Sequence, residues 1–266
     1  MKNGVNVDEC ERDINLLIPA GAETTATVIR ATLMYIMASP TVYRKLKDEL
    51  AKGILDGRIS DPITNDEAKA LPYLQVSGHI GEGRCSRATL THLAQAVINE
   101  GLRIVPPAPL GFPKRVPPAG DTILGKFIPG GTDIYVNTYS MMRNKEVFGD
   151  DVDVFRPERF LEGSSEKKAL LFKHVQLNFG HGRWLCAGKA LALIELNKIF
   201  VEVGRCPASS RTVADVGIQL LRRFDFQILD PQKPWVTKCS ISWSINGFLV
   251  RATDGSFGGQ PDHPTA

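Results

Sequence analysis

Residues 179–188 place the strongest constraint on this chain, because they put one cysteine in a glycine-rich loop directly before an apolar stretch at residues 189–200. Glycines let a backbone approach a flat ligand closely. Backbone N–H groups near the start of a helix stabilise a negative charge on sulfur. A cysteine held in this way, here Cys186, can be an axial ligand of a heme iron.

Three other interpretations of this loop are possible in principle. A single cysteine is often only a small buried hydrophobic residue, and for Cys186 this alternative stays open. A dinucleotide-binding fingerprint would need glycine at position 185, which is leucine. A phosphate-binding loop would need a hydroxyl residue after Lys189, which is followed by Ala190. Neither nucleotide-binding motif fits.

Composition is that of an ordinary globular protein of 266 residues, with 43% hydrophobic and 23% charged residues. The net charge of +3 is small and the basic residues are scattered, so no nucleic-acid partner is expected. Five cysteines without framework spacing suit a reducing compartment. Residues 14–37 are apolar, but Glu23 and Arg30 interrupt them, so a buried helix is expected there rather than a membrane span.

Hydrophobic periodicity predicts helices at residues 11–38, 42–52, 93–104 and 189–200. We expect Ser39 to cap the second helix and Pro40 to occupy its first position. Thr64 and Glu67 match a capping box that would open another short helix.

Two hairpins are predicted. Residues 122–128 and 133–137 would pair around the two glycines at 130 and 131. Residues 239–245 and 248–251 flank Asn246-Gly247, a strong signal for a type I′ turn. Residues 144–163 are expected to be irregular.

A second functional segment lies in the middle of the first long helix. Gly21 and Pro19 weaken helical hydrogen bonding there and can open a local groove, next to Glu23 and Thr24. The alternative is a packing glycine beside threonines that bond back to the helix backbone.

Two further segments supply a charged triad. Glu100 and Arg103 lie three residues apart on one predicted helix face, and Arg159 lies in Pro-Glu-Arg-Phe at residues 157–160. A buried carboxylate between two guanidinium groups must be fully hydrogen-bonded. We interpret the triad as structural rather than catalytic.

These segments, together with the strand pair around residues 128–137, occur in an order that resembles the cytochrome P450 monooxygenases. The likeness covers about residues 11–254 and looks most like a fungal group related to pisatin demethylase. It implies a mainly α chain with small β-sheets (α+β), corresponding to the C-terminal half of the P450 fold and incomplete at the N-terminus. Residues 1–254 would be the partial catalytic domain and residues 255–266 a disordered tail.

The resemblance implies a heme-dependent monooxygenase that inserts one oxygen atom of O2 into a small organic substrate. Heme b (iron protoporphyrin IX) would be the cofactor, with electrons from NADPH through NADPH-cytochrome P450 reductase. Cys186 would bind the iron, and Glu23 with Thr24 would relay protons. The heme-binding positions carried over are Phe179, Gly180, Gly182, Arg183, Trp184, Cys186, Gly188 and Gly21.

One position departs from the family pattern. The family usually has an arginine two residues before the cysteine, where it contacts a heme propionate, but this chain has Trp184. Arg183 would then have to supply the charge from another direction, and the Trp184 indole could donate one N–H.

The resemblance also implies an endoplasmic-reticulum enzyme facing the cytosol, with a membrane anchor that this chain does not carry. The anchor and much of the substrate pocket would precede Met1. We therefore expect this chain alone to aggregate or to fail to retain heme, so that its own activity is doubtful. The alternative function is a non-catalytic fragment or pseudogene product that does not bind heme.

Residues 76–95 and 203–219 interrupt otherwise continuous family patterns. Both segments begin with valine, whose codons start with GT, and end with glutamine, which CAG can encode. We hypothesise that they are retained introns translated in a mistaken gene structure. The alternative is a pair of true surface loops, which proteins tolerate because the entropy of loop closure grows slowly with length.

We predict that sequencing of the transcript will find mRNA lacking the codons for residues 76–95 and 203–219. The flanking codons should be joined in frame, because both segments would be removed by splicing. An mRNA that retains both segments would contradict the hypothesis.

Overall fold

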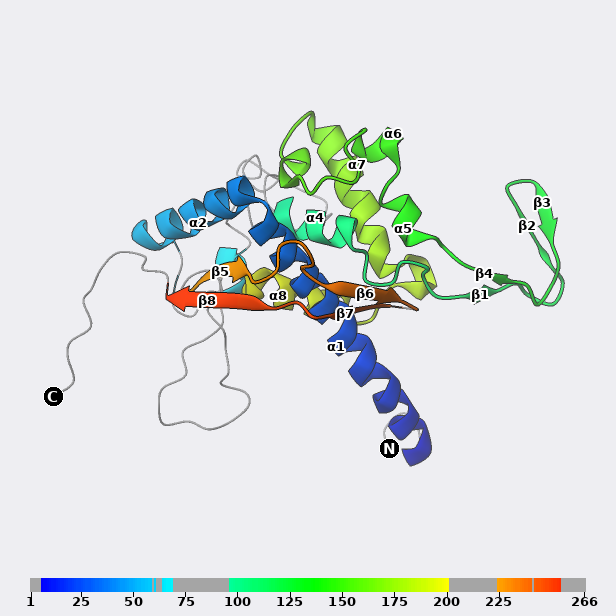
Figure 1. Cartoon of the computed structure of the whole chain (residues 1–266). Helices are drawn as coiled ribbons and strands as arrows, with labels where there is room; N and C mark the ends of the chain where they lie inside the picture. The colour runs from blue at the N-terminus through cyan, green and yellow to red at the C-terminus, as the bar shows by residue number, and fades with distance from the viewer. Residues whose placement is uncertain are drawn as a thin grey trace.

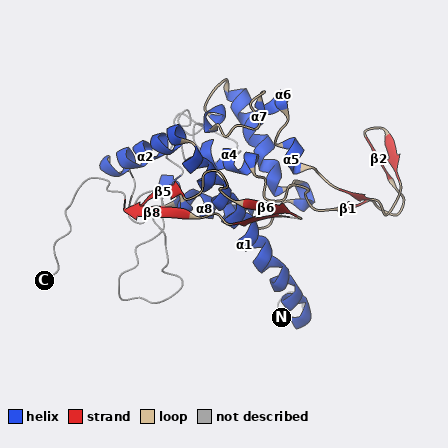
Figure 2. Ribbon diagram, viewed as in Figure 1, coloured by secondary structure: helices blue, strands red, loops and turns tan. Residues whose placement is uncertain are grey.

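The computed structural model describes residues 6–58, 60, 64–68, 96–200, 224–240 and 242–254. Across these residues the chain is largely helical with short antiparallel strands (Figure 1; Figure 2), which confirms the mainly α, α+β class. The segments at residues 76–95, 203–219 and 255–266 lie outside the described residues, so those predictions remain untested.

The helices include five longer ones and several single turns. The longer ones are α1 (Val7–Ala38), α2 (Pro40–Leu55), α4 (Ala96–Ile104), α7 (Ser165–Gln176) and α8 (Lys189–Ile199). The short α-helices are α3 (Asn65–Ala68), α5 (Thr138–Met141) and α6 (Lys145–Phe148), and the 3-10 turns are η2 (Pro157–Phe160), η3 (Leu177–Phe179) and η4 (Gly182–Trp184). The turns α6 and η2 fall within residues 144–163, which were expected to be irregular.

The described strands pair two by two, always antiparallel. The pairs are β1 (Lys114–Arg115) with β4 (Asp133–Ile134), β2 (Asp121–Ile123) with β3 (Lys126–Ile128), β5 (Phe224–Ile228) with β8 (Val250–Asp254), and β6 (Val236–Cys239) with β7 (Trp243–Asn246). The first two pairs form an arm that extends away from the helices (Figure 1).

Both predicted hairpins are wrong in their pairing. Residues 121–128 fold on themselves, because Leu124 and Gly125 adopt positive φ (50° and 76°) and make a two-residue turn. Gly130 and Gly131 therefore do not join the predicted partners. Gly247 does turn the chain (φ 72°), but β7 before it pairs with β6 and β8 after it pairs with β5.

Helix α1 begins earlier than predicted because Asn6 caps it. The side chain of Asn6 accepts a hydrogen bond from the N–H of Glu9, whose carboxylate accepts one from the N–H of Asn6. The helix ends before Ser39, as expected, and Pro40 opens α2. The predicted Ser39 cap is wrong, because its backbone (φ −120°, ψ 85°) lies outside the extended conformation of Asn6 and its side chain makes no capping bond.

Thr64 and Glu67 form the predicted capping box at the start of α3. The N–H of Thr64 donates to the Glu67 carboxylate at 2.8 Å, and the N–H of Glu67 donates to the Thr64 hydroxyl at 3.2 Å. This local prediction is confirmed.

Only the second half of α1 is buried, so the expectation of a buried helix over residues 14–37 is wrong for its first part. Its buried side chains begin at Thr25, whereas Leu16, Leu17 and Ile18 are each more than 60% exposed. In Figure 1 this first half projects from the body of the molecule. Within the described ranges, no helix combines the length and apolarity that crossing a bilayer requires.

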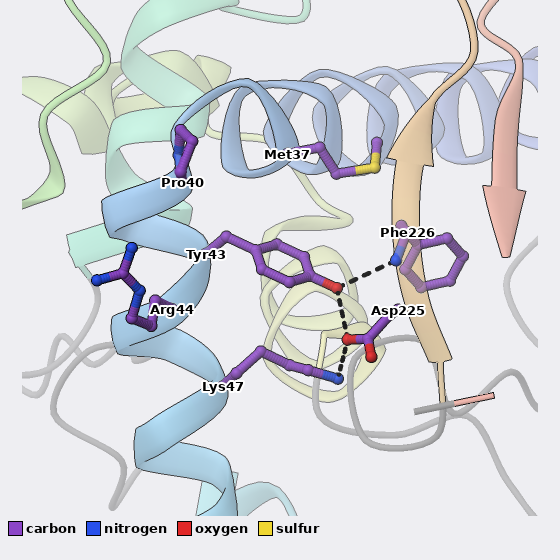
Figure 3. Close-up of a pocket in the computed structure, with 7 residues that line it drawn as sticks. All are labelled: Met37, Pro40, Tyr43, Arg44, Lys47, Asp225 and Phe226. Carbon is purple, nitrogen blue, oxygen red and sulfur yellow. Dashed lines mark hydrogen bonds and ion pairs between the residues drawn. The ribbon is translucent and has the colours of Figure 1, made fainter. Parts of the chain in front are cut away.

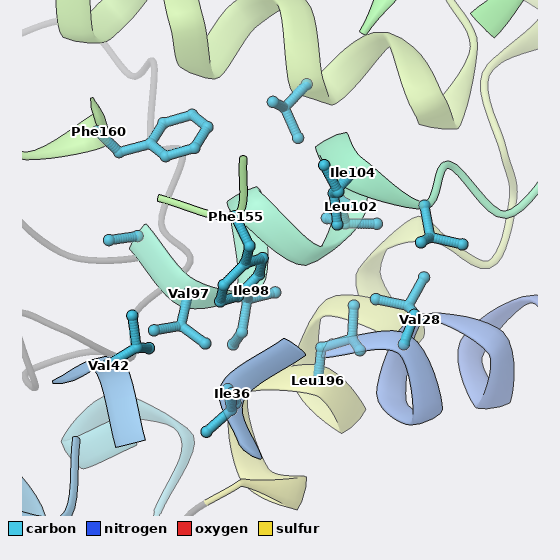
Figure 4. Close-up of a cluster of buried hydrophobic side chains, with 14 of the residues drawn as sticks. Val28, Ile36, Val42, Val97, Ile98, Leu102, Ile104, Phe155, Phe160 and Leu196 are labelled. Atoms are coloured by element: carbon cyan, nitrogen blue, oxygen red, sulfur yellow. The ribbon is translucent and has the colours of Figure 1, made fainter. Parts of the chain in front are cut away.

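The core gathers around α4, all nine of whose residues are buried. Its apolar side chains belong to one buried cluster with side chains of α1, α2, α8 and the segment that leads to η2 (Figure 4). Val28 and Ile36 of α1, Ile98 of α4, Phe155 and Leu196 of α8 are members of this cluster. Because α4 is enclosed, its charged residues are buried as well.

Helices α1 and α4 approach closely at Gly101. A Cβ atom at this position would overlap the hydroxyl of Thr32, whose side chain is itself fully buried. Gly21 of α1 is the opposite case, since a Cβ atom there would meet nothing within 4 Å. The two helical glycines therefore have different physical roles.

We predict that Gly101→Ala destabilises the protein by about 1–3 kcal/mol, because overpacking exceeds the gain in helix propensity. Gly21→Ala, the matched control, should instead stabilise it by about 1 kcal/mol. Urea unfolding followed by circular dichroism measures both values. Equal changes in the free energy of unfolding for the two substitutions would contradict the close approach of α1 and α4 at Gly101.

Candidate functional site

The cysteine loop is held closed by backbone hydrogen bonds. The N–H of Cys186 donates to the carbonyl of Phe179 at 2.7 Å, and the N–H of Lys189, the first residue of α8, donates to the carbonyl of Cys186 at 3.3 Å. Gly188 lies at the N-cap position of α8 without a side-chain cap. The backbone of Cys186 is therefore held between the end of η3 and the beginning of α8.

Gly180 and Gly182 have the conformations that the loop requires. Both have positive φ, at 75° and 59°. A Cβ atom on Gly180 would overlap the carbonyl oxygen of Trp184, so this position tolerates no side chain. A Cβ atom on Gly182 would meet nothing within 4 Å, which leaves open space beside the loop.

Cys186 is a free and exposed thiol, so the alternative of a small buried cysteine is wrong. The side chains just before it, Trp184 and Leu185, are large, apolar and about half exposed, at 55% and 51%. A soft sulfur donor beside uncovered apolar surface is chemically suited to a flat apolar ligand that carries a metal.

Cations lie close to two aromatic rings of this loop. The Nζ atom of Lys114, on β1, is 5.0 Å from the centroid of the Trp184 ring, and the guanidinium carbon of Arg183 is 4.9 Å from it. The Nζ atom of Lys189 lies 5.5 Å from the centroid of the half-buried Phe179 ring. Lys114 was not predicted from the sequence, because 69 positions separate it from Arg183.

On α1, the segment with Gly21, Glu23 and Thr24 is helical and largely exposed. The Thr24 hydroxyl donates to the carbonyl of Ala20 at 2.8 Å, which is the back-bonded arrangement left open by the sequence. The Glu23 carboxylate lies 3.8 Å from the Arg30 guanidinium. Gly21 is not a packing glycine, because no atom lies near its missing Cβ.

The helices that carry or adjoin the two predicted halves of the site are in contact. Helix α8, which starts three residues after Cys186, packs against α1. Among the described residues, no hydrogen bond or ion pair joins Glu23 or Thr24 directly to the cysteine loop.

The structure brings the three charged residues of the proposed triad together. The Glu100 carboxylate accepts from Arg103 at 2.8 and 2.7 Å and from the Nε of Arg159 at 3.1 and 3.0 Å. The N–H of Arg156 also donates to it at 2.8 Å. The side chain of Glu100 is completely buried, so every one of these contacts offsets its desolvation.

Asp151 extends this network towards the surface. Its carboxylate accepts from Arg159 at 2.9 Å and from Arg156 at 2.6 Å. Partial burial alone would raise the pKa of Asp151, but the hydrogen bonds and positive charges of Arg159 and Arg156 outweigh burial and lower that pKa to about 2. Asp151 therefore stays ionised at neutral pH.

A pocket of about 430 Å³ lies elsewhere, between α2 and β5 (Figure 3). Its polar groups satisfy one another: the Tyr43 hydroxyl is 3.2 Å from the Asp225 carboxylate, which Lys47 contacts at 2.9 Å. Burial is the main reason that the pKa of Tyr43 rises to about 12. The pocket contains none of the predicted site residues.

Comparison with known proteins identifies the family. The family model described as Cytochrome P450 matches residues 2–77 and 84–203. The chain belongs to the cytochrome P450 family. It is 40% identical over 258 residues to "Cytochrome P450 monooxygenase aba1" of Botryotinia fuckeliana. The aligned region covers 96% of this chain and 43% of that protein.

Two further relatives support the same placement. The chain is 41% identical over 269 residues to "Cytochrome P450 monooxygenase abl1" of Leptosphaeria maculans (98% of this chain, 42% of that protein). It is 29% identical over 238 residues to "Pisatin demethylase" of Fusarium vanettenii (90% and 38%). The predicted resemblance to this fungal group is confirmed. The chain spans about two fifths of the length of the curated relatives it matches.

The residues around Cys186 fit the heme that the family uses. They provide one exposed sulfur donor, open space next to Gly182, and the uncovered apolar surface of Trp184 and Leu185. A heme bound through sulfur needs all three: a thiolate, room for the ring, and apolar contact.

We predict that Arg159→Met destabilises the protein by about 3–5 kcal/mol, because it leaves the buried Glu100 carboxylate underpaired. The matched control is Arg115→Met, which breaks an exposed ion pair with Asp133 and should destabilise the protein far less, because solvent screens that pair. Urea unfolding measures both. A similar loss of unfolding free energy in the two variants would show that the buried triad contributes no more to stability than an exposed ion pair does.

Proposed function

We propose that this chain is part of a heme-thiolate monooxygenase in which the Cys186 thiolate is the axial ligand of heme b. The observation that carries the proposal is the exposed, unpartnered thiol in a closed glycine loop of a cytochrome P450 family member. Phe179, Gly180, Gly182, Arg183, Trp184, Gly188 and Gly21 are the further residues proposed to lie against the cofactor.

The loop prepares the sulfur for this role. The hydrogen bond from the Cys186 N–H to the carbonyl of Phe179 holds the backbone from which the side chain projects. The start of α8 follows directly, and its free N–H groups carry partial positive charge that stabilises a thiolate. When bound, the heme supplies the activation of O2 and the transfer of one oxygen atom to an organic substrate.

Thr24 and Glu23 are proposed to move protons on the opposite side of the site. The Thr24 hydroxyl donates to Ala20 and still has lone pairs that can accept a hydrogen bond from water. Glu23 is exposed and can exchange protons with solvent, while Arg30 stands near it as a counter-charge. The open space beside Gly21 provides room for that water.

The remaining parts of the proposal follow the family. Electrons would come from NADPH through NADPH-cytochrome P450 reductase, and the enzyme would face the cytosol on the endoplasmic-reticulum membrane. The substrate would be a small organic molecule, as membership of the cytochrome P450 family implies.

The proposal predicts thiolate ligation that depends on Cys186. Hemin in excess is titrated into the 266-residue chain in mild detergent. The excess of hemin offsets the weak retention of heme that the sequence predicts, and the detergent offsets the predicted aggregation. The reduced CO complex of the wild type should show the red-shifted Soret band of a thiolate ligand. Cys186→Ser should abolish that band because serine does not supply a thiolate.

Cys239→Ser is the matched control, because Cys239 is also a free exposed thiol. This variant should keep the thiolate spectrum. A wild-type spectrum in Cys186→Ser, or its loss in Cys239→Ser alone, would reject Cys186 as the ligand. A wild type that binds no hemin would instead favour the non-catalytic alternative.

A further inference from the structure

Trp184 stands where the family pattern has an arginine, and two cations lie against its indole ring. Lys114 comes from β1, whereas Arg183 is the neighbouring residue in the loop. Trp184 is 55% exposed and is only two residues from Cys186. Two positive charges therefore lie beside residue 184, although this residue is itself uncharged.

The position of Lys114 on β1 leaves its ammonium free of the carboxylate of Asp133 and close to Trp184. The next residue, Arg115, is neutralised by Asp133 of β4 at 2.9 Å. Successive side chains of a strand point to opposite faces, so Lys114 points away from that carboxylate. Its ammonium donates to the carbonyl of Phe112 at 2.9 Å and reaches the Trp184 ring.

The two cations are not neutralised within the described part of the chain. Neither Lys114 nor Arg183 forms an ion pair with a carboxylate there. Both lie within about 5 Å of one ring centroid, so their charges are at most about 10 Å apart, the Debye length at 0.1 M salt. They repel each other, and each cation–π contact returns only about 0.5–1 kcal/mol at an exposed site.

A pair of unneutralised cations beside an apolar surface has the chemistry of a site for an apolar ligand with two carboxylates. Heme b is such a ligand. Guanidinium and ammonium groups bind carboxylates through short, charge-assisted hydrogen bonds. Contact with an indole face uses none of the N–H donors of a cation. The Arg183 guanidinium and the Lys114 ammonium, which donates once to Phe112, therefore keep N–H groups that can donate to a carboxylate.

We infer that Trp184 is a positioning residue, and that it holds Lys114 and Arg183 as the pair of groups that bind the heme carboxylates in this chain. This inference rests on the proposed function, since it concerns the same cofactor. It replaces the expectation that Arg183 alone supplies the charge. In this inference the indole ring of Trp184 positions the two cations, whereas the sequence had suggested that its N–H donates a hydrogen bond.

The test compares two ligands in the full-length chain: hemin, and hemin dimethyl ester, whose carboxylates are blocked. The measured quantity is the ratio of their dissociation constants, obtained from Soret titrations. The wild type should prefer hemin. Lys114→Met and Arg183→Met should each reduce this preference by about tenfold, the effect of losing one charge-assisted hydrogen bond.

Trp184→Leu tests the positioning role, because it removes the ring but no charge. It should reduce the preference for hemin as much as the loss of one cation does. Trp184→Arg, which reinstates the family residue, should restore that preference. Lys126→Met is the matched control: it removes an exposed lysine on β3 of the same arm and should leave the ratio unchanged.

The outcomes separate this inference from the proposed function. If the two methionine variants keep the wild-type ratio while thiolate ligation still depends on Cys186, the carboxylate site is wrong and the proposed function stands. If Trp184→Leu alone keeps the ratio, the positioning role is wrong. If the wild type binds no hemin, or binds it independently of Cys186, both proposals fail.

Discussion

The buried carboxylate of Glu100 is the interaction on which the rest of the structure depends. It lies in α4, at the centre of the core, and accepts hydrogen bonds from Arg103 of the same helix and from Arg159 in η2. A carboxylate without water is tolerated only when such partners surround it. Because η2 leads into α7, which is followed by η3 and the cysteine loop, this network ties the loop to the core.

The arrangement separates residues that hold the fold from residues that can meet a ligand. The charged triad is buried, and the two arginines also donate to backbone carbonyls such as that of Val154. Cys186, Trp184 and the first half of α1 are exposed instead. Exposed apolar side chains of this size indicate a surface that binds something apolar. In the proposed function the heme covers part of it.

Local signals in the sequence predicted local structure well. The capping box at Thr64, the break at Ser39-Pro40 and the helix after Cys186 all depend on neighbours within a few residues. Strand pairing was predicted poorly, because Asn246-Gly247 is a strong turn signal whose flanking strands find distant partners. Helix α7 was not predicted, although Ser164 caps it and Leu171 and Val175 mark its buried face.

The sequence by itself determined the family, the glycine loop around Cys186 and the residues of the charged triad, because these are patterns of spacing along the chain. Only the tertiary structure decided that Glu100 is fully buried and that the cysteine is exposed. It also decided that Lys114 and Arg183 both lie against the ring of Trp184. Burial and long-range contact depend on how distant elements pack, and spacing along a chain carries no record of that packing.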